Sequence, residues 1–183
     1  MNVLIVNGSP KRSGTTKKAL TTVAERLEAA GVETTWFELG NKPVRGCIGC
    51  GGCSRSGDGR CVFADDAANE LIEAILAADG VVIGTPVYFA GANGALLALL
   101  DRVFYAASVH GKQFAGKFAA AIATEWRAGA VCACDEINRY FLFSGMHVVA
   151  SDYWPVRFNS EEDEWGDNML ALLGDRMAGL LAK

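Results

Sequence analysis

Residues 7–16 have the side-chain types of an anion-binding loop and follow a short apolar run at the start of the chain. A helical pattern begins at the end of this segment. The N-terminus of a helix favours a phosphate, because its first N–H groups are unpaired and its dipole is positive there. The side chains available to such an anion are Ser9, Lys11, Arg12, Ser13, Thr15 and Thr16. Gly8 and Gly14 are too far apart for a GxGxxG dinucleotide loop, and no Gly-Lys-Ser/Thr sequence opens the helix. We therefore predict a terminal monophosphate held by side chains; the alternative is a capped helix after a solvated turn.

A second segment, residues 84–91, combines aromatic side chains with glycines directly after another apolar run. Tyr88 and Phe89 can pack on a flat heterocycle, and backbone N–H groups of a glycine-flanked loop can hydrogen-bond to the edge of such a ring. The alternative is that both aromatic residues belong to the core or to an interface. The phosphate loop nearby favours the ring-binding interpretation.

Four of the six cysteines lie in one glycine-rich segment at about residues 40–62: Cys47, Cys50, Cys53 and Cys61. Glycines allow one loop to wrap closely around a metal centre. The CxxCxxC spacing resembles the first three ligands of a bacterial ferredoxin run, which holds an iron–sulfur cluster. The fourth cysteine departs from that run, since it comes after seven intervening residues and no proline follows it. A structural zinc site more often has two CxxC pairs with a longer separation. Zinc, free thiols and a redox disulfide remain alternatives.

Strands and helices that alternate along the chain must position these three segments. Short apolar runs predict five strands, at residues 3–6, 33–39, 81–83, 118–123 and 147–151. Apolar residues at helical spacing predict helices at residues 15–30, 65–76, 93–107, 131–143 and 166–181. This alternation indicates a parallel sheet with helices on both faces. Ligands of such sheets bind at the carboxyl ends of the strands, which is where the predicted binding loops fall.

The motifs also resemble those of a known family. Residues 8–16 look like the FMN phosphate loop of the NAD(P)H-dependent FMN reductases, and residues 84–91 with 97–102 are similar to that family's flavin-ring segment. The resemblance covers nearly the whole chain. It implies one flavodoxin-like domain over residues 1–183: an α/β three-layer sandwich with a five-stranded parallel sheet in the order 2-1-3-4-5. The FMN contacts that it implies are Ser9, Lys11, Arg12, Ser13, Thr15, Thr16, Pro86, Val87, Tyr88, Phe89, Gly91, Thr124 and Gly129.

The segment after the fourth predicted strand departs from this family. Gly129 fits the family's glycine-rich turn against the ring, whereas Trp126 and Arg127 are less typical. Trp126 could cover the flavin, and Arg127 could attract the phosphates of a nicotinamide nucleotide. Both would equally suit a surface at a subunit boundary.

The cysteine spacing is similar to the compact motif of the iron–sulfur flavoproteins, a branch of the same family that binds a 4Fe-4S cluster. The resemblance therefore implies Cys47, Cys50, Cys53 and Cys61 as cluster ligands. It implies an FMN-dependent oxidoreductase that takes electrons from NAD(P)H or a reduced carrier and passes them to a small-molecule acceptor or a redox protein. It also implies a homodimer or tetramer. The alternatives are a non-catalytic flavodoxin-type electron carrier and a thiol or metal redox module.

Composition excludes several other functions. The chain of 183 residues has a net charge of −4 and no basic block, so we expect no nucleic-acid partner. No apolar run approaches the roughly 20 residues of a membrane helix, and the first residues resemble a strand rather than a secretory signal, so we expect a cytoplasmic protein. Cys132 and Cys134 are predicted to be small apolar fillers on a helix, and residues 161–164 a solvated acidic turn.

Overall fold

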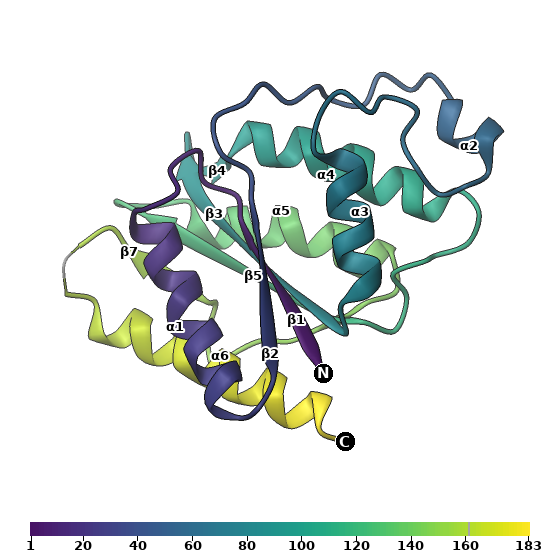
Figure 1. Cartoon of the computed structure of the whole chain (residues 1–183). Helices are drawn as coiled ribbons and strands as arrows, with labels where there is room; N and C mark the ends of the chain where they lie inside the picture. The colour runs from purple at the N-terminus through teal and green to yellow at the C-terminus, as the bar shows by residue number, and fades with distance from the viewer. Residues whose placement is uncertain (161) are drawn as a thin grey trace.

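A computed structural model describes residues 1–160 and 162–183, so Glu161 of the predicted acidic turn lies outside the described residues. The centre of the fold is a sheet whose main path has the order β2-β1-β3-β5-β6 (Figure 1). These strands are β2 (Glu33–Glu38), β1 (Asn2–Asn7), β3 (Gly80–Tyr88), β5 (Phe118–Glu125) and β6 (His147–Val148). Every neighbouring pair on this path is parallel. The predicted order of the five strands is confirmed.

The sheet differs from the prediction in its strand count and in the lengths of its strands. Within the described residues it has seven strands, because β4 (Gly91–Ala92) pairs antiparallel with the end of β3, and β7 (Val156–Phe158) pairs parallel with the end of β5. The predicted strand at 147–151 is only two residues long. The chain turns at Ser151, whose Oγ donates to the carbonyl of Tyr153 at 2.6 Å, and then returns to the sheet as β7.

Helices form a layer on each face of the sheet, as predicted for a three-layer sandwich (Figure 1). One face carries α1 (Thr15–Ala29) and α6 (Glu164–Leu181). The other face carries α3 (Ala68–Ala77), α4 (Gly94–Ser108) and α5 (Ala130–Phe143). A short helix that the sequence pattern did not indicate, α2 (Gly52–Ser56), lies inside the cysteine segment.

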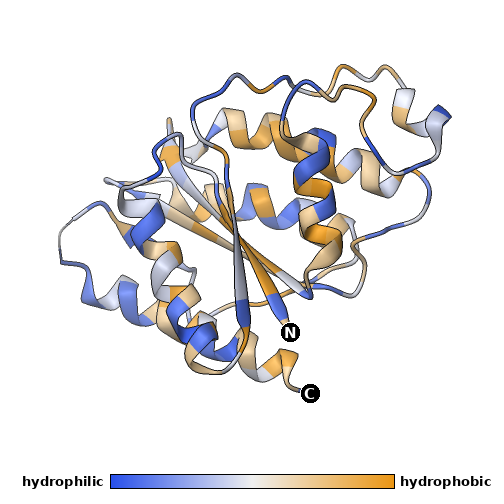
Figure 2. Ribbon diagram, in the orientation of Figure 1, coloured by the Kyte–Doolittle hydropathy of each residue, from blue (hydrophilic) through white to orange (hydrophobic). Residues whose placement is uncertain are grey.

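The burial of each strand explains its place in the sheet. Residues 3–6 of β1 are all buried, as expected for a parallel strand covered on both faces. By contrast, β2 alternates between exposed and partly buried positions over most of its length, which suits its place at the edge. Figure 2 shows the same contrast, with β1 mostly orange and β2 largely pale or blue. Burial of these apolar runs is the main force that stabilises the fold.

Among the described residues, no helix is both long and apolar enough to cross a membrane.

Candidate functional site

The predicted binding segments meet at the carboxyl edge of the sheet. In the strand register, Asn7 at the end of β1 lies beside Gly84 of β3, and Pro86 of β3 lies beside Thr124 of β5. This edge is the usual ligand site of a doubly wound sheet. Thr124 and Pro86 thus lie within strands and not in loops as the sequence pattern indicated.

The loop after β1 is held in shape by its own side chains. Asn7 is fully buried, and its Oδ1 accepts from the N–H of Ser9 at 3.1 Å. The Oγ of Ser9 then accepts from the N–H of Lys11 at 3.1 Å. The N–H of Gly8 donates to the carbonyl of Gly84 at 2.8 Å, which ties the loop to β3. The loop is therefore a fixed cradle, and Asn7 is a structural member of it that sequence reasoning missed.

The N-terminus of α1 is left open to a ligand. Its N-cap is Gly14, so no side chain caps the first N–H groups, and its first turn has no acidic residue. The helices α4 and α6 differ, since the side chains of Asn93 and Asp163 cap them. Unpaired N–H groups at a positive helix end are what an anionic group would bind.

The hydroxyl groups and the cationic side chains of this loop differ in how deeply they are buried. Thr16 is buried, and its Oγ1 lies 2.7 Å from the Oγ1 of Thr124, which links the first and third binding segments. Thr15 hydrogen-bonds to Asn159. The predicted contacts that stay exposed on the loop are Lys11, Arg12 and Ser13.

The aromatic segment forms a tight hairpin instead of the predicted loop. The strands β3 and β4 pair at Val87–Ala92 and Tyr88–Gly91, so only two residues make the turn. Both have backbone angles in the left-handed region, with φ of 49° at Phe89 and 62° at Ala90. Such turns usually contain glycine or asparagine, so this backbone is strained, and strain of this kind often accompanies a functional site. The Phe89 side chain is fully exposed and Tyr88 is half exposed, which excludes both from the core.

Gly129 fits the hairpin against the start of α5. Its φ is +108°, and an added Cβ would lie 2.5 Å from the Cα of Ala90. No other residue type fits there without displacing the backbone of the turn. The end of β5 beyond Glu125 carries Trp126 and Arg127 on the surface, Trp126 being 85% exposed.

Two further residues that sequence reasoning missed connect these segments. The side-chain amide of Asn93 donates to the carbonyl of Gly8 at 2.7 Å, and its backbone N–H donates to Thr85 Oγ1 at 3.0 Å. Glu136 accepts from the N–H of Ala92 at 2.7 Å and so holds the hairpin to α5. An asparagine before a helical pattern is a sequence signal for a cap, but its bond to Gly8 depends on the tertiary fold.

The four cysteines of the 40–62 segment line one small cavity of about 20 Å³. Cys53 is buried, Cys61 is half-buried, and Cys47 and Cys50 are exposed. Burial raises the pKa of the Cys53 thiol, and the neighbouring Cys61 and Cys47 act in the same direction. Within the described residues, no three His, Cys, Asp or Glu side chains are grouped as they would be around one metal ion. The four cysteines thus line one cavity, but their side chains are not gathered around a single point.

The remaining two cysteines lie on α5, away from this cavity. Cys134 is buried as predicted, and burial raises its pKa to about 12. Cys132 is exposed, so the prediction of an apolar filler is wrong for it. The reason is that residues two apart on a helix face different sides.

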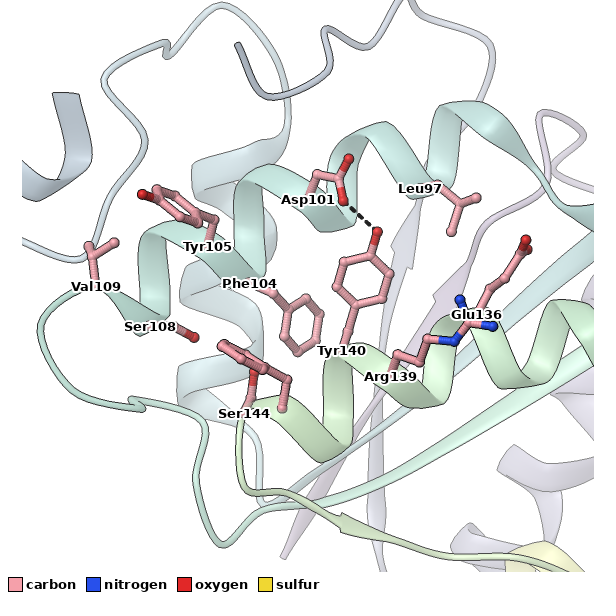
Figure 3. Close-up of a pocket in the computed structure, with 11 residues that line it drawn as sticks. Leu97, Asp101, Phe104, Tyr105, Ser108, Val109, Glu136, Arg139, Tyr140 and Ser144 are labelled. Atoms are coloured by element: carbon pink, nitrogen blue, oxygen red, sulfur yellow. Dashed lines mark hydrogen bonds between the residues drawn. The ribbon is translucent and has the colours of Figure 1, made fainter. Parts of the chain in front are cut away.

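A separate apolar groove lies between α4 and α5, with a volume of about 740 Å³ (Figure 3). Phe104, Tyr105 and Phe143 line it, and Tyr140 donates to Asp101 at 2.5 Å across it. Tyr105 also lines the cysteine cavity, so the two hollows are neighbours. This groove contains none of the predicted flavin contacts.

Comparisons with known proteins agree with this geometry. Residues 1–161 match the family described as NADPH-dependent FMN reductase. An iron–sulfur flavoprotein of Methanocaldococcus jannaschii is 32% identical to the chain, over 83% of the chain and 77% of that protein. An iron–sulfur flavoprotein of Archaeoglobus fulgidus is 28% identical, over 97% of the chain and 96% of that protein.

Solved structures show the same fold. An archaeal flavodoxin superposes with a TM-score of 0.67 at 15% identity and full coverage of both chains. An NADH:FMN oxidoreductase in its apo form gives a TM-score of 0.69 at 23% identity, with 98% of this chain and 89% of that chain covered. The fold is therefore flavodoxin-like, as predicted. Taken with the sequence match over most of its length, the chain belongs to the NADPH-dependent FMN reductase family.

Proposed function

We propose that this protein is an FMN-dependent oxidoreductase that takes electrons from NAD(P)H or a reduced carrier. It passes them to a small-molecule acceptor or to a redox protein. Membership of the family supports a flavin-binding oxidoreductase or electron-transfer role. The observation that carries the proposal is the uncapped N-terminus of α1, which lies beside buried hydroxyls and across the strand edge from the strained hairpin.

The residues present fit FMN. The N–H groups at the start of α1, with Ser9, Ser13 and Thr16, would hold its phosphate, and Lys11 and Arg12 would balance its charge. The hairpin of residues 86–91, Thr124 and the turn at Gly129 would border the flavin ring. FMN supplies the electron-transfer chemistry when bound, and the protein positions it and sets its electrostatic environment.

We also propose that the cysteine segment binds a 4Fe-4S cluster through Cys47, Cys50, Cys53 and Cys61. The support is that all four line one cavity, inside a loop whose glycines give it a compact path. Each thiolate of such a cluster binds a different iron, so its ligands surround a volume as these do. Cys47 and Cys50 are exposed, so the side of the cavity that they form is open to solvent.

Absorption and iron analysis of protein purified without air test both assignments. We expect flavin bands, a broad absorption that bleaches on reduction, and about four irons per chain for a cluster of this type. The matched variant Cys50→Ser should lose the iron and keep the flavin, because Cys50 lines a cavity whose lining includes none of the predicted flavin contacts.

The outcomes separate the alternatives. Flavin without NAD(P)H oxidation, with electrons still accepted from a reduced carrier, would assign a flavodoxin-type carrier. Flavin without iron would leave a reductase whose cysteines are thiols. If neither chromophore is present and added FMN does not bind, the proposal fails and a thiol or metal redox module replaces it.

A homodimer or tetramer is part of this proposal, and the groove between α4 and α5 is the surface that suits a second copy. It presents apolar area together with the charged side chains of Asp101, Glu136 and Arg139, and a two-fold contact would bring the same surface of two copies together. Light scattering should give a particle of at least twice the chain mass, and Phe143→Glu should lower that mass. A monomeric mass at micromolar concentration would contradict this interface.

We propose that the protein is located in the cytoplasm, where thiols stay reduced.

A further inference from the structure

The position of Cys61 needs a physical explanation, because it does not continue the CxxCxxC run. Seven residues separate it from Cys53, and that interval contains the end of the short helix α2 and two glycines in the left-handed region. These are Gly57 and Gly59, with φ of 71° and 73°. They reverse the chain so that Cys61 returns to the cavity of the other three cysteines. Local turns bring it near, but they do not orient its sulfur.

The backbone of Cys61 is held by α3. Its N–H donates to Asn69 Oδ1 at 2.8 Å, and its carbonyl accepts from Asn69 Nδ2 at 2.9 Å. One side chain thus satisfies both backbone groups of the same residue. This pair fixes where the Cα of Cys61 lies relative to α3.

The sulfur of Cys61 is held by α4. Arg102 is 2% exposed, and its Nε donates to Cys61 Sγ at 3.4 Å. The guanidinium is always charged, and a charged donor binds a thiolate more strongly than it binds a neutral thiol. Arg102 is the last residue of the segment 97–102, which resembles the family's flavin-ring segment. Its side chain nevertheless lines the cysteine cavity.

The same guanidinium joins the two ends of the cysteine segment. Its Nη1 donates to the carbonyl of Arg45, before the first cysteine, at 3.3 Å. Its Nη2 donates to the carbonyl of Phe63, after the last cysteine, at 2.8 Å. It also forms an ion pair with Asp66, whose side chain is only 9% exposed. A lysine has a single ammonium group and cannot reach these four partners at once.

We propose that Arg102 and Asn69 are positioning residues that hold Cys61 in place as the fourth ligand of the cysteine site. Arg102 orients the sulfur, and Asn69 fixes the backbone. The role of Cys61 as a ligand rests on the proposed cluster, whereas the orientation of its side chain does not.

Two measurements on the full-length chain test this proposal. In protein purified without air, we expect Arg102→Lys and Asn69→Ala to release iron to a chelator about tenfold faster than wild type, the usual effect of losing a residue that supports a metal ligand. After the iron is removed, we expect iodoacetamide to modify Cys61 several-fold faster in Asn69→Ala, because that variant frees the backbone of Cys61 and keeps the Arg102 donor. In Arg102→Lys we expect the rate at Cys61 to differ several-fold from wild type, because the donor that orients the sulfur and favours its reactive thiolate is lost. Both rates are read by peptide mass spectrometry. The rate at Cys53 in the same chain should stay unchanged. Arg26→Lys on α1 makes the same chemical change at an exposed ion pair, with Asp175, and serves as the control.

The results distinguish positioning from general destabilisation. A residue that only stabilises the fold would raise the rates at Cys53 and Cys134 together with Cys61, and that result would overturn the proposal, as would unchanged rates in both variants. If Arg102→Lys does not fold, Arg102→Met with Asp66→Leu replaces the buried pair by apolar groups of similar size, which proteins often tolerate. Wild-type protein without iron would contradict the cluster, and the iodoacetamide rates would still decide the role of Arg102.

Discussion

Gly129→Ala should lower the free energy of unfolding by about 3 kcal/mol and weaken FMN binding at least tenfold. The new Cβ would lie 2.5 Å from the Cα of Ala90 and 2.8 Å from its carbonyl carbon, and neither backbone atom can move without shifting the whole turn. The positive φ of Gly129 adds a strain of about 1–2 kcal/mol for any other residue. Because the hairpin at Phe89 and Ala90 is already strained, it has little capacity to adapt.

Gly111→Ala is the matched control for this variant. Gly111 has nearly the same backbone angle, with φ of +104°, but a Cβ added there has no neighbour within 4 Å. Gly111→Ala should therefore lose only the stability that the backbone strain costs, and its affinity for FMN should stay unchanged. Urea denaturation of both variants, with FMN titrated by fluorescence quenching, separates the two effects. Equal losses of stability and of FMN affinity in the two variants would show that contact between Gly129 and the hairpin does not shape the flavin site.

The second large effect is expected at the phosphate loop, where Thr16→Val should weaken FMN binding about 10- to 100-fold. That range corresponds to losing one hydrogen bond to a charged group, about 1.5–3 kcal/mol. Valine keeps the shape of the side chain but removes the hydroxyl, which lies 2.7 Å from the hydroxyl of Thr124. The variant should also lose about 1 kcal/mol of stability, because the buried Thr124 hydroxyl keeps no partner on α1.

Riboflavin provides the decisive comparison because it has the flavin ring but no phosphate. Thr16→Val should reduce the affinity for FMN and leave the affinity for riboflavin nearly unchanged. Thr22 lies on the same helix and is half-buried, and its Oγ1 donates to the carbonyl of Lys18 within that helix, so Thr22→Val should change neither affinity. If both flavins lose affinity equally, Thr16 acts on the ring or on the fold, and the phosphate assignment of this loop is wrong.

These two variants probe the two ends of one site that two side chains hold together. Asn93 ties α4 to the phosphate loop through Gly8, and Glu136 ties α5 to the hairpin through Ala92. The strained turn is thus kept in place by partners on helices, as preorganisation of a binding site requires. The same helix α4 carries Arg102, so the proposed flavin site and the cysteine cavity share one rigid support.

Sequence patterns were sufficient for the positions of the main strands and for most helix bounds, whereas the order of the strands came from the resemblance to a family. Strands such as residues 3–6 are buried on both faces and therefore appear as continuous apolar runs. The hairpin was not predictable in this way, because Phe89 and Ala90 are not the residue types that mark a two-residue turn. The short strand β7 was missed because three residues carry too little pattern.

The sequence by itself determined the parts of this protein that depend on local order. The phosphate loop, the helix that follows it and the CxxCxxC spacing are all contiguous, so their chemistry is visible without a fold. Only the tertiary structure decided which distant residues complete them. Thr124 reaches Thr16 from a position 108 residues away, and Arg102 reaches Cys61 from 41 residues away. Such contacts follow from the packing of helices and strands on one sheet, and no local propensity encodes the distance between two side chains.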